Sequence, residues 1–101
     1  PHGLRTPWFI SDVKRLNYQV ITWNDMTNDY AAKTTTEDIV SRILGKVRRG
    51  GIIDLHDGKD KFHGIDRSNM VRALPIIIER LKAEGFRFVT IPELLQTPAY
   101  K

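Results

Sequence analysis

The stretch that decides the fold is Gly51-Ile-Ile-Asp-Leu-His-Asp-Gly58, in which apolar, β-branched residues give way to a histidine, an aspartate and a glycine. β-branched residues favour strands, so the sequence predicts a strand over 51–55. The segments 19–23 (Gln-Val-Ile-Thr-Trp) and 86–91 (Phe-Arg-Phe-Val-Thr-Ile) have the same character. We predict strands at these three places and a strand end over 3–6.

Helical patterns alternate with the strands. Apolar residues recur at helical spacing over 36–49 and 68–84, and a shorter pattern covers 11–17. Gly85 is typical of a helix end, and Pro75 predicts a kink or a restart. We expect the inward faces to hold Val13, Leu16, Ile39, Val40, Ile43, Leu44, Val47, Val71, Leu74, Ile77, Ile78 and Leu81.

This alternation of strands and helices is the pattern of successive βα units around a parallel sheet, which places the chain in the α/β class. A complete barrel of eight such units takes ~200 residues or more, and the chain has 101. We expect a single unit over 1–101, half of a barrel, whose sheet edges need a partner. Because the chain begins at Pro1, we also expect it to be a piece of a longer protein.

Composition excludes several classes of protein. The chain has no cysteine, so neither disulfides nor thiolate metal sites are available. Its 16 Lys and Arg against 12 Asp and Glu give a formal charge of +4, but the basic residues are scattered and no nucleic-acid-binding motif accompanies them. No apolar run approaches the ~20 residues of a membrane helix. We predict no nucleic-acid partner and no membrane span.

Polar residues gather where the predicted strands end, and in parallel α/β folds this is the edge that carries active sites. His56 directly follows a strand, and a carboxylate beside it would favour the protonated ring, which makes it a candidate general acid. Asp25 and Asp29 are the candidate partners of His56. Arg5 is a further candidate, with a surface ion pair as its alternative. Trp8 and Trp23 are candidate substrate contacts, with packing as theirs.

The remaining histidines, His2 and His63, are interpreted as bystanders. The sequence has neither a His-x-x-x-His pair nor clustered carboxylates. It therefore predicts no metal site within this chain.

Three segments in order carry a family resemblance. Arg5-Thr-Pro-Trp-Phe9, Trp23-Asn-Asp-Met-Thr-Asn-Asp-Tyr30 and Leu55-His-Asp57 resemble the third, fourth and fifth motifs of polysaccharide deacetylases, the NodB-like carbohydrate esterase family. The stretch 73–95 is similar to the last helix and strand of that family. The resemblance covers nearly the whole chain.

The resemblance implies the C-terminal half of a deformed (β/α) barrel that removes acetyl groups from N-acetylated carbohydrate polymers such as peptidoglycan or chitin. It implies a divalent metal, often zinc, with its ligands in a companion N-terminal half, and an exported or cell-envelope location. Arg5 would orient the missing base and the backbone N–H of Trp8 would help hold the oxyanion. His56 would protonate the leaving amine, with Trp23 and Leu55 around the acetyl pocket.

The chain departs from the family pattern at several positions. Thr6 and Phe9 replace a proline and a glycine of the third motif. The carboxylate expected in the fourth motif falls on Met26, or on Asp25 after a one-residue shift, and we favour Asp25 as the partner of His56. Asp54 stands where the family commonly has leucine, and it would make the acetyl pocket more polar or support His56.

Two other interpretations remain open. One is a related hydrolase that acts on a small amide. The other is a non-catalytic carbohydrate-binding or assembly module that keeps the half-barrel without the chemistry.

Overall fold

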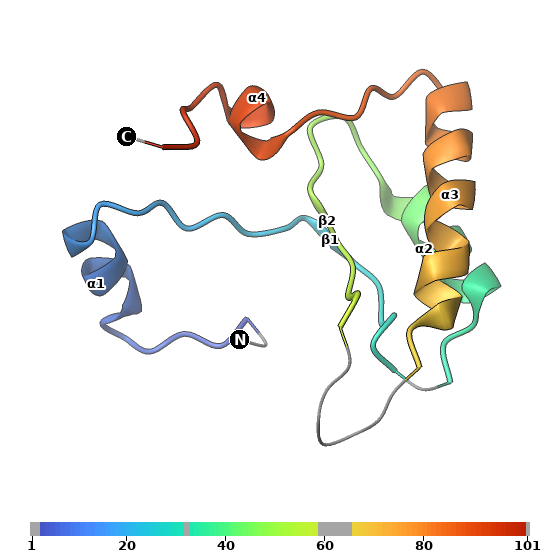
Figure 1. Ribbon diagram of the computed structural model, residues 1–101, viewed down its shortest axis with the longest axis horizontal. Helices are drawn as coiled ribbons and strands as arrows, with labels where there is room; N and C mark the ends of the chain where they lie inside the picture. Colours follow the sequence, from blue (N-terminus) through green and yellow to red (C-terminus); the bar gives the residue numbers. More distant parts are fainter. Residues whose placement is uncertain (1–2, 32, 59–65, 101) are drawn as a thin grey trace.

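The computed structural model describes residues 3–31, 33–58 and 66–100. Its elements follow in the order α1 (Phe9–Arg15), β1 (Asp25–Met26), α2 (Thr36–Lys46), β2 (Ile53–Asp54), α3 (Ser68–Ala83) and α4 (Ile91–Leu95). Figure 1 shows α2 and α3 side by side on one side of the strands, and the segment that carries α1 on the other. None of the helices in these ranges is long and apolar enough to cross a membrane.

The two strands pair in parallel, with Asp25 opposite Ile53 and Met26 opposite Asp54. Parallel strands joined through a helix confirm the α/β prediction, but the predicted four-stranded sheet is wrong for the described residues. The segments 19–23 and 86–90 and the strand end over 3–6 form no ladder there. A strand requires a neighbour that supplies its hydrogen-bond partners, and within the described ranges only β1 and β2 find one.

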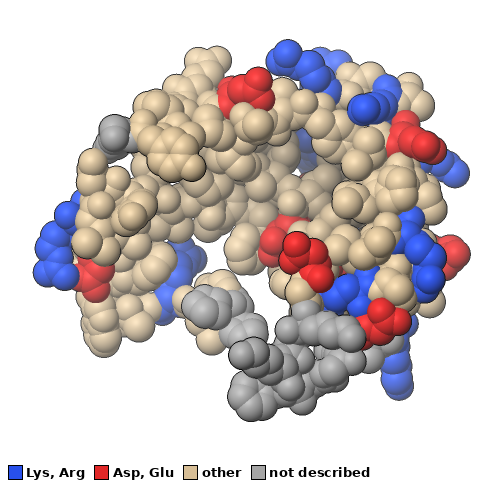
Figure 2. Space-filling model, in the orientation of Figure 1, with Lys and Arg blue, Asp and Glu red and all other residues tan. Residues whose placement is uncertain are grey.

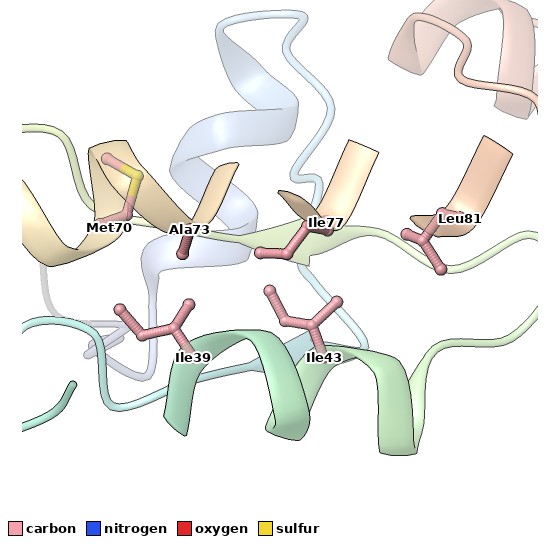
Figure 3. Packing of buried hydrophobic residues seen from close by; sticks show 6 residues of the cluster. All are labelled: Ile39, Ile43, Met70, Ala73, Ile77 and Leu81. Carbon is pink, nitrogen blue, oxygen red and sulfur yellow. The ribbon is translucent and has the colours of Figure 1, made fainter. Parts of the chain in front are cut away.

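The core lies between α2 and α3. Ile39 and Ile43 of α2 face a row of α3 residues, as Figure 3 shows, and the buried cluster consists of Ile39, Ile43, Met70, Ala73, Ile77 and Leu81. Ile53 and Leu55 pack against this cluster from the strand side. The prediction for the inward face of α2 is therefore confirmed, since Val40, Leu44 and Val47 also pack against the cluster.

The predicted inward face of α3 is partly wrong. Ile77 and Leu81 are buried, but Val71 is 60% exposed and Leu74 is exposed as well. Met70 and Ala73 take the inward places instead, in the buried cluster with Ile39 and Ile43 of α2. The helix continues through Pro75 without a restart.

The ends of the helices follow the capping rules. Thr35 begins α2 with a reciprocal capping box to Asp38, as the hydroxyls and acids there predict. Gly85 ends α3 with a φ of 87°, a left-handed conformation that glycine adopts without a Cβ clash. The first helix spans 9–15 instead of the predicted 11–17, and none of its residues is buried. Leu16, predicted to be inward, is 65% exposed.

The molecule is flat and open. Its extents are 42 × 38 × 20 Å and its radius of gyration is 15.7 Å, whereas a compact chain of this length has a radius near ~13 Å. Many large apolar side chains outside the α2–α3 core are exposed, among them Leu4, Trp8, Tyr18, Val20, Ile21, Phe88 and Val89. This apolar surface is available for contact with further protein.

Candidate active site

The parallel pairing of β1 and β2 decides which polar residues meet. Both strands run in the same direction, so the segments that follow them leave the sheet at the same edge. Asp29 lies three residues after β1 and His56 lies two residues after β2. The predicted gathering of polar side chains at this edge is confirmed for these two residues.

Asp29 binds His56 through both of its carboxylate oxygens. Its Oδ2 accepts a hydrogen bond of 2.6 Å from the backbone N–H of His56, and its Oδ1 lies 3.0 Å from the ring Nδ1. The Asp29 side chain is fully buried, whereas 40% of the His56 side chain is exposed. A buried carboxylate must be hydrogen-bonded, and these contacts satisfy it.

The contact with Asp29 fixes the chemistry of the imidazole. An ionised carboxylate only accepts hydrogen bonds, so the geometry assigns the proton at Nδ1 to the bond with Asp29. The other ring nitrogen, Nε2, makes no hydrogen bond to any residue in the described ranges. Tyr30 packs its ring edge-on against the imidazole, with the ring centroids 5.4 Å apart. Within the part of the chain that the structure describes, His56 is thus held at Nδ1 and has no partner at Nε2.

Arg67 joins the two segments that carry the pair. Its Nε donates to the carbonyl of Gly58 at 2.7 Å, and its Nη1 donates to the carbonyl of Asp29 at 3.3 Å. Arg67 is not among the residues predicted from the sequence, because it precedes α3, far along the chain from both partners. Its position just before a helix gives no signal of this contact.

The preferred pairing of His56 with Asp25 is wrong. Asp25 belongs to β1 itself, and its carboxylate lies near the turn before β2, 3.6 Å from the place a Cβ on Gly51 would occupy. It lines a small surface depression with Lys46, Arg48 and Arg49. Asp25 was favoured because a one-residue shift places it on the carboxylate of the fourth motif. In the structure Asp25 lies within β1, and Asp29, beyond the end of that strand, reaches His56.

A groove of about 940 Å³ lies on the side of the strands opposite α2 and α3. The side chains that give it its chemical character are Arg5, Trp23, Met26, Tyr30 and Asp54. In Figure 2 this face of the molecule is hollowed near its centre, with acidic side chains at the rim of the hollow. The groove therefore offers aromatic surface and one charge of each sign to a ligand.

Two predicted substrate contacts lie outside this groove. Trp8 is exposed at the start of α1 and does not line the groove. Leu55 packs against the α2–α3 core. It follows Asp54, which lines the groove, and successive residues of a strand point to opposite faces. The structure thus brings Arg5 and Trp23 to one groove and leaves Trp8 and Leu55 apart from it.

Within 3–31, 33–58 and 66–100, no three histidine, aspartate or glutamate side chains lie close enough together to hold a metal ion. Among these residues, no third side chain of this kind lies beside the His56–Asp29 pair to complete a metal site. The residues described do not fit a metal on their own. His2 and His63, the predicted bystanders, lie outside the described residues.

The chain has sequence relatives among known proteins. The chain is 36% identical over 98 residues to a peptidoglycan-N-acetylglucosamine deacetylase of Bacillus cereus, which covers 95% of this chain and 43% of the relative. The chain is homologous to the polysaccharide deacetylases of the NodB family. A chitooligosaccharide deacetylase of a Bradyrhizobium species is 28% identical over 100 residues, which is 93% of this chain and 45% of the relative.

A third relative is named for two activities. A bifunctional xylanase/deacetylase of Pseudobutyrivibrio xylanivorans is 42% identical over 71 residues, which is 70% of this chain and 11% of that protein. No family model matches the chain. The chain spans less than half the length of these relatives, so the similarity concerns only a part of each of them.

Proposed function

We propose that the chain is the C-terminal part of a metal-dependent polysaccharide N-deacetylase and supplies the general-acid side of its active site. The substrate is an N-acetylated carbohydrate polymer of the peptidoglycan or chitin type. The observation that carries this proposal is the buried Asp29 carboxylate, which holds the half-exposed imidazole of His56 at Nδ1. Homology to deacetylases over 95% of the chain supports it.

The reaction consumes water and releases acetate. The water oxygen bonds to the amide carbonyl carbon, the C–N bond breaks, and the nitrogen leaves as an amine. An amide nitrogen is a poor leaving group until it is protonated, so an acid must give it a proton as the bond breaks. His56 donates this proton from Nε2, while Asp29 stabilises the positive charge of the protonated ring.

The other roles follow from the resemblance and from the groove. Arg5 orients the base that the companion segment provides, and Trp23 contacts the sugar within the groove. The resemblance also assigns the backbone N–H of Trp8 to the oxyanion, and because Trp8 lies outside the groove here, this contact would form only in the assembled domain. Leu55 supports the strand beneath the acetyl pocket from the core side.

The metal ligands belong to another part of the domain in this proposal. Since the residues described here do not fit a metal on their own, we assign the ligands of the expected divalent metal, zinc by resemblance, to a companion N-terminal half. The steps attributed to this chain are those of its own residues: proton donation, orientation of the imidazole and contact with the sugar.

The companion half also accounts for the open surface. The segments 19–23 and 86–91 were predicted as strands, but 19–23 and 86–90 form no ladder here and Ile91 begins α4. They expose large apolar side chains such as Val20, Ile21, Phe88 and Val89. Strands supplied by the companion would complete a deformed (β/α) barrel over this chain. Co-expression of the two halves should give a one-to-one complex. A chain that stays monomeric and well folded alone, and ignores the companion, would contradict this part.

Acetate release tests the activity. The complete protein, loaded with zinc, is assayed on chitin oligomers, on peptidoglycan and on a small acetamide. Turnover of either polymer supports the proposal, whereas turnover of the small amide alone supports the related small-amide hydrolase.

A non-catalytic carbohydrate-binding module is the second candidate, because the groove presents Trp23 and Tyr30 as aromatic surface for a sugar ring. A complete protein that binds chitin oligomers but releases no acetate with any divalent metal would favour this second function.

A further inference from the structure

Asp54 is a carboxylate on the groove side of the sheet. Its strand neighbours, Ile53 and Leu55, pack against the α2–α3 core. Because side chains alternate along a strand, Asp54 points the opposite way, and it lines the groove. It is the only acid among the described groove residues.

The Asp54 carboxylate has no protein partner in the described ranges. It makes no hydrogen bond or ion pair with any residue there, although Asp54 is partly buried. The residue opposite it on β1 is the apolar Met26. Arg5, the only cation among the described groove residues, forms no ion pair with it. Partial burial of a charge is costly unless donors satisfy it.

The supporting role for His56 that the sequence allowed is already filled. Asp29 contacts both the backbone and the ring of His56, and Asp54 makes no hydrogen bond to that histidine. The Asp54 carboxylate is therefore free to act on a ligand in the groove.

We propose that Asp54 determines the specificity of this site by accepting hydrogen bonds from ring hydroxyl groups of a sugar that lies against Trp23 and Tyr30. This inference rests on the proposed deacetylase function. A sugar ring offers an apolar face to aromatic side chains and hydroxyl donors at its edge. An acetamide without hydroxyls would bury the carboxylate and leave it without a donor, so the site discriminates against it.

The test compares two substrates in the complete, zinc-loaded protein and in its Asp54→Leu and Asp54→Asn variants. Acetate release is measured on a tetramer of N-acetylglucosamine and on an aryl acetamide that has no hydroxyl groups. Loss of a hydrogen bond to a charged acceptor should lower kcat/KM for the tetramer by about 10- to 100-fold in Asp54→Leu. The same variant should hold or gain activity on the aryl acetamide, so that the ratio of the two activities falls.

Asp54→Asn keeps an oxygen acceptor without the charge. Its ratio of kcat/KM on the tetramer to kcat/KM on the aryl acetamide should therefore lie between the ratios of wild type and Asp54→Leu. If Asp54→Leu does not fold, as judged by circular dichroism, the Asn variant provides the comparison. Asp12→Asn, an exposed acid of α1, is the matched control. An unchanged ratio in an active, folded Asp54 variant overturns the inference and leaves the proposed function standing. A wild-type protein that releases acetate from neither substrate rejects the proposed function and this inference with it.

Discussion

Asp29 contacts His56 at two points, the backbone N–H at 2.6 Å and the ring Nδ1 at 3.0 Å. The first contact fixes the distance between the segments that follow β1 and β2. The second fixes the orientation of the imidazole and leaves Nε2 without a partner among the described residues. Because the carboxylate is fully buried and the ring is 40% exposed, the pair resembles an orienting acid behind a working histidine.

Asp29→Asn should lower kcat of the complete protein by about 100-fold or more, because the amide neither stabilises the protonated ring nor fixes its tautomer. Asp25→Asn should cost at least about ten times less, since Asp25 does not contact His56. Steady-state acetate release measures both, with Asp12→Asn as the surface control. Equal losses in the Asp25 and Asp29 variants would show that the pairing seen here is not the working one.

Which face of α3 is buried can be tested by a matched pair of substitutions to alanine. Ile77 is 2% exposed and Val71 is 60% exposed. Ile77→Ala should lower the free energy of unfolding by about 2 to 5 kcal/mol through cavity formation, whereas Val71→Ala should change it by less than about 0.5 kcal/mol. Urea unfolding of the complete protein gives both values. A loss at Val71 as large as that at Ile77 would favour the inward face predicted from the sequence, which held both residues.

Thr27 carries a buried hydroxyl that has no hydrogen-bond partner among the described residues, and the residue is 2% exposed. Thr27→Val keeps the shape and removes the unsatisfied group, so it should raise the free energy of unfolding by about 1 kcal/mol. Thermal unfolding measures the change, with Thr22→Val at an exposed position as the control. A loss of stability would mean that the hydroxyl has a partner in the assembled domain.

The capping box of α2 predicts a pH effect. The backbone N–H of Thr35 and then its hydroxyl, both donating to Asp38, lower the pKa of that carboxyl below its ordinary value. A lowered pKa in the folded state means that the ionised carboxyl stabilises the fold above its ordinary pKa. This contribution is lost as the pH falls through the lowered value.

Asp38→Asn should therefore unfold at a lower temperature than wild type near neutral pH. The difference should shrink as the pH falls below the ordinary aspartate pKa of about 3.9 and through the lowered pKa of the folded wild-type carboxyl. Circular dichroism melts of both proteins across this range measure the gap. A gap that is constant with pH would mean that the charge of Asp38 does not contribute to the cap.

The sequence predicted the local features well. The start of α2 at Thr35 and the end of α3 at Gly85 depend on side chains and backbone freedom within a few residues. The inward face of α2 follows from helical spacing alone. The edge at which His56 and Asp29 meet follows from the rule that parallel strands present their carboxyl ends together.

Features that depend on distant contacts were not predictable. The burial of Ala73 in place of Leu74 depends on how closely α2 approaches α3, which helical spacing does not specify. The contact of Arg67 with Asp29 joins residues far apart in the chain. The absence of a ladder at 19–23 and 86–90 reflects which strands are present to pair, and residue preferences alone contain no such information.

The most direct test of the central claim is the effect of His56→Ala on acetate release by the complete protein, with bound zinc measured in the same samples. We predict that kcat on chitin oligomers falls by about 100-fold or more, while the metal content stays equal to that of wild type, because in the proposed mechanism His56 donates a proton and holds no metal. Full activity in a folded His56→Ala protein would contradict that mechanism.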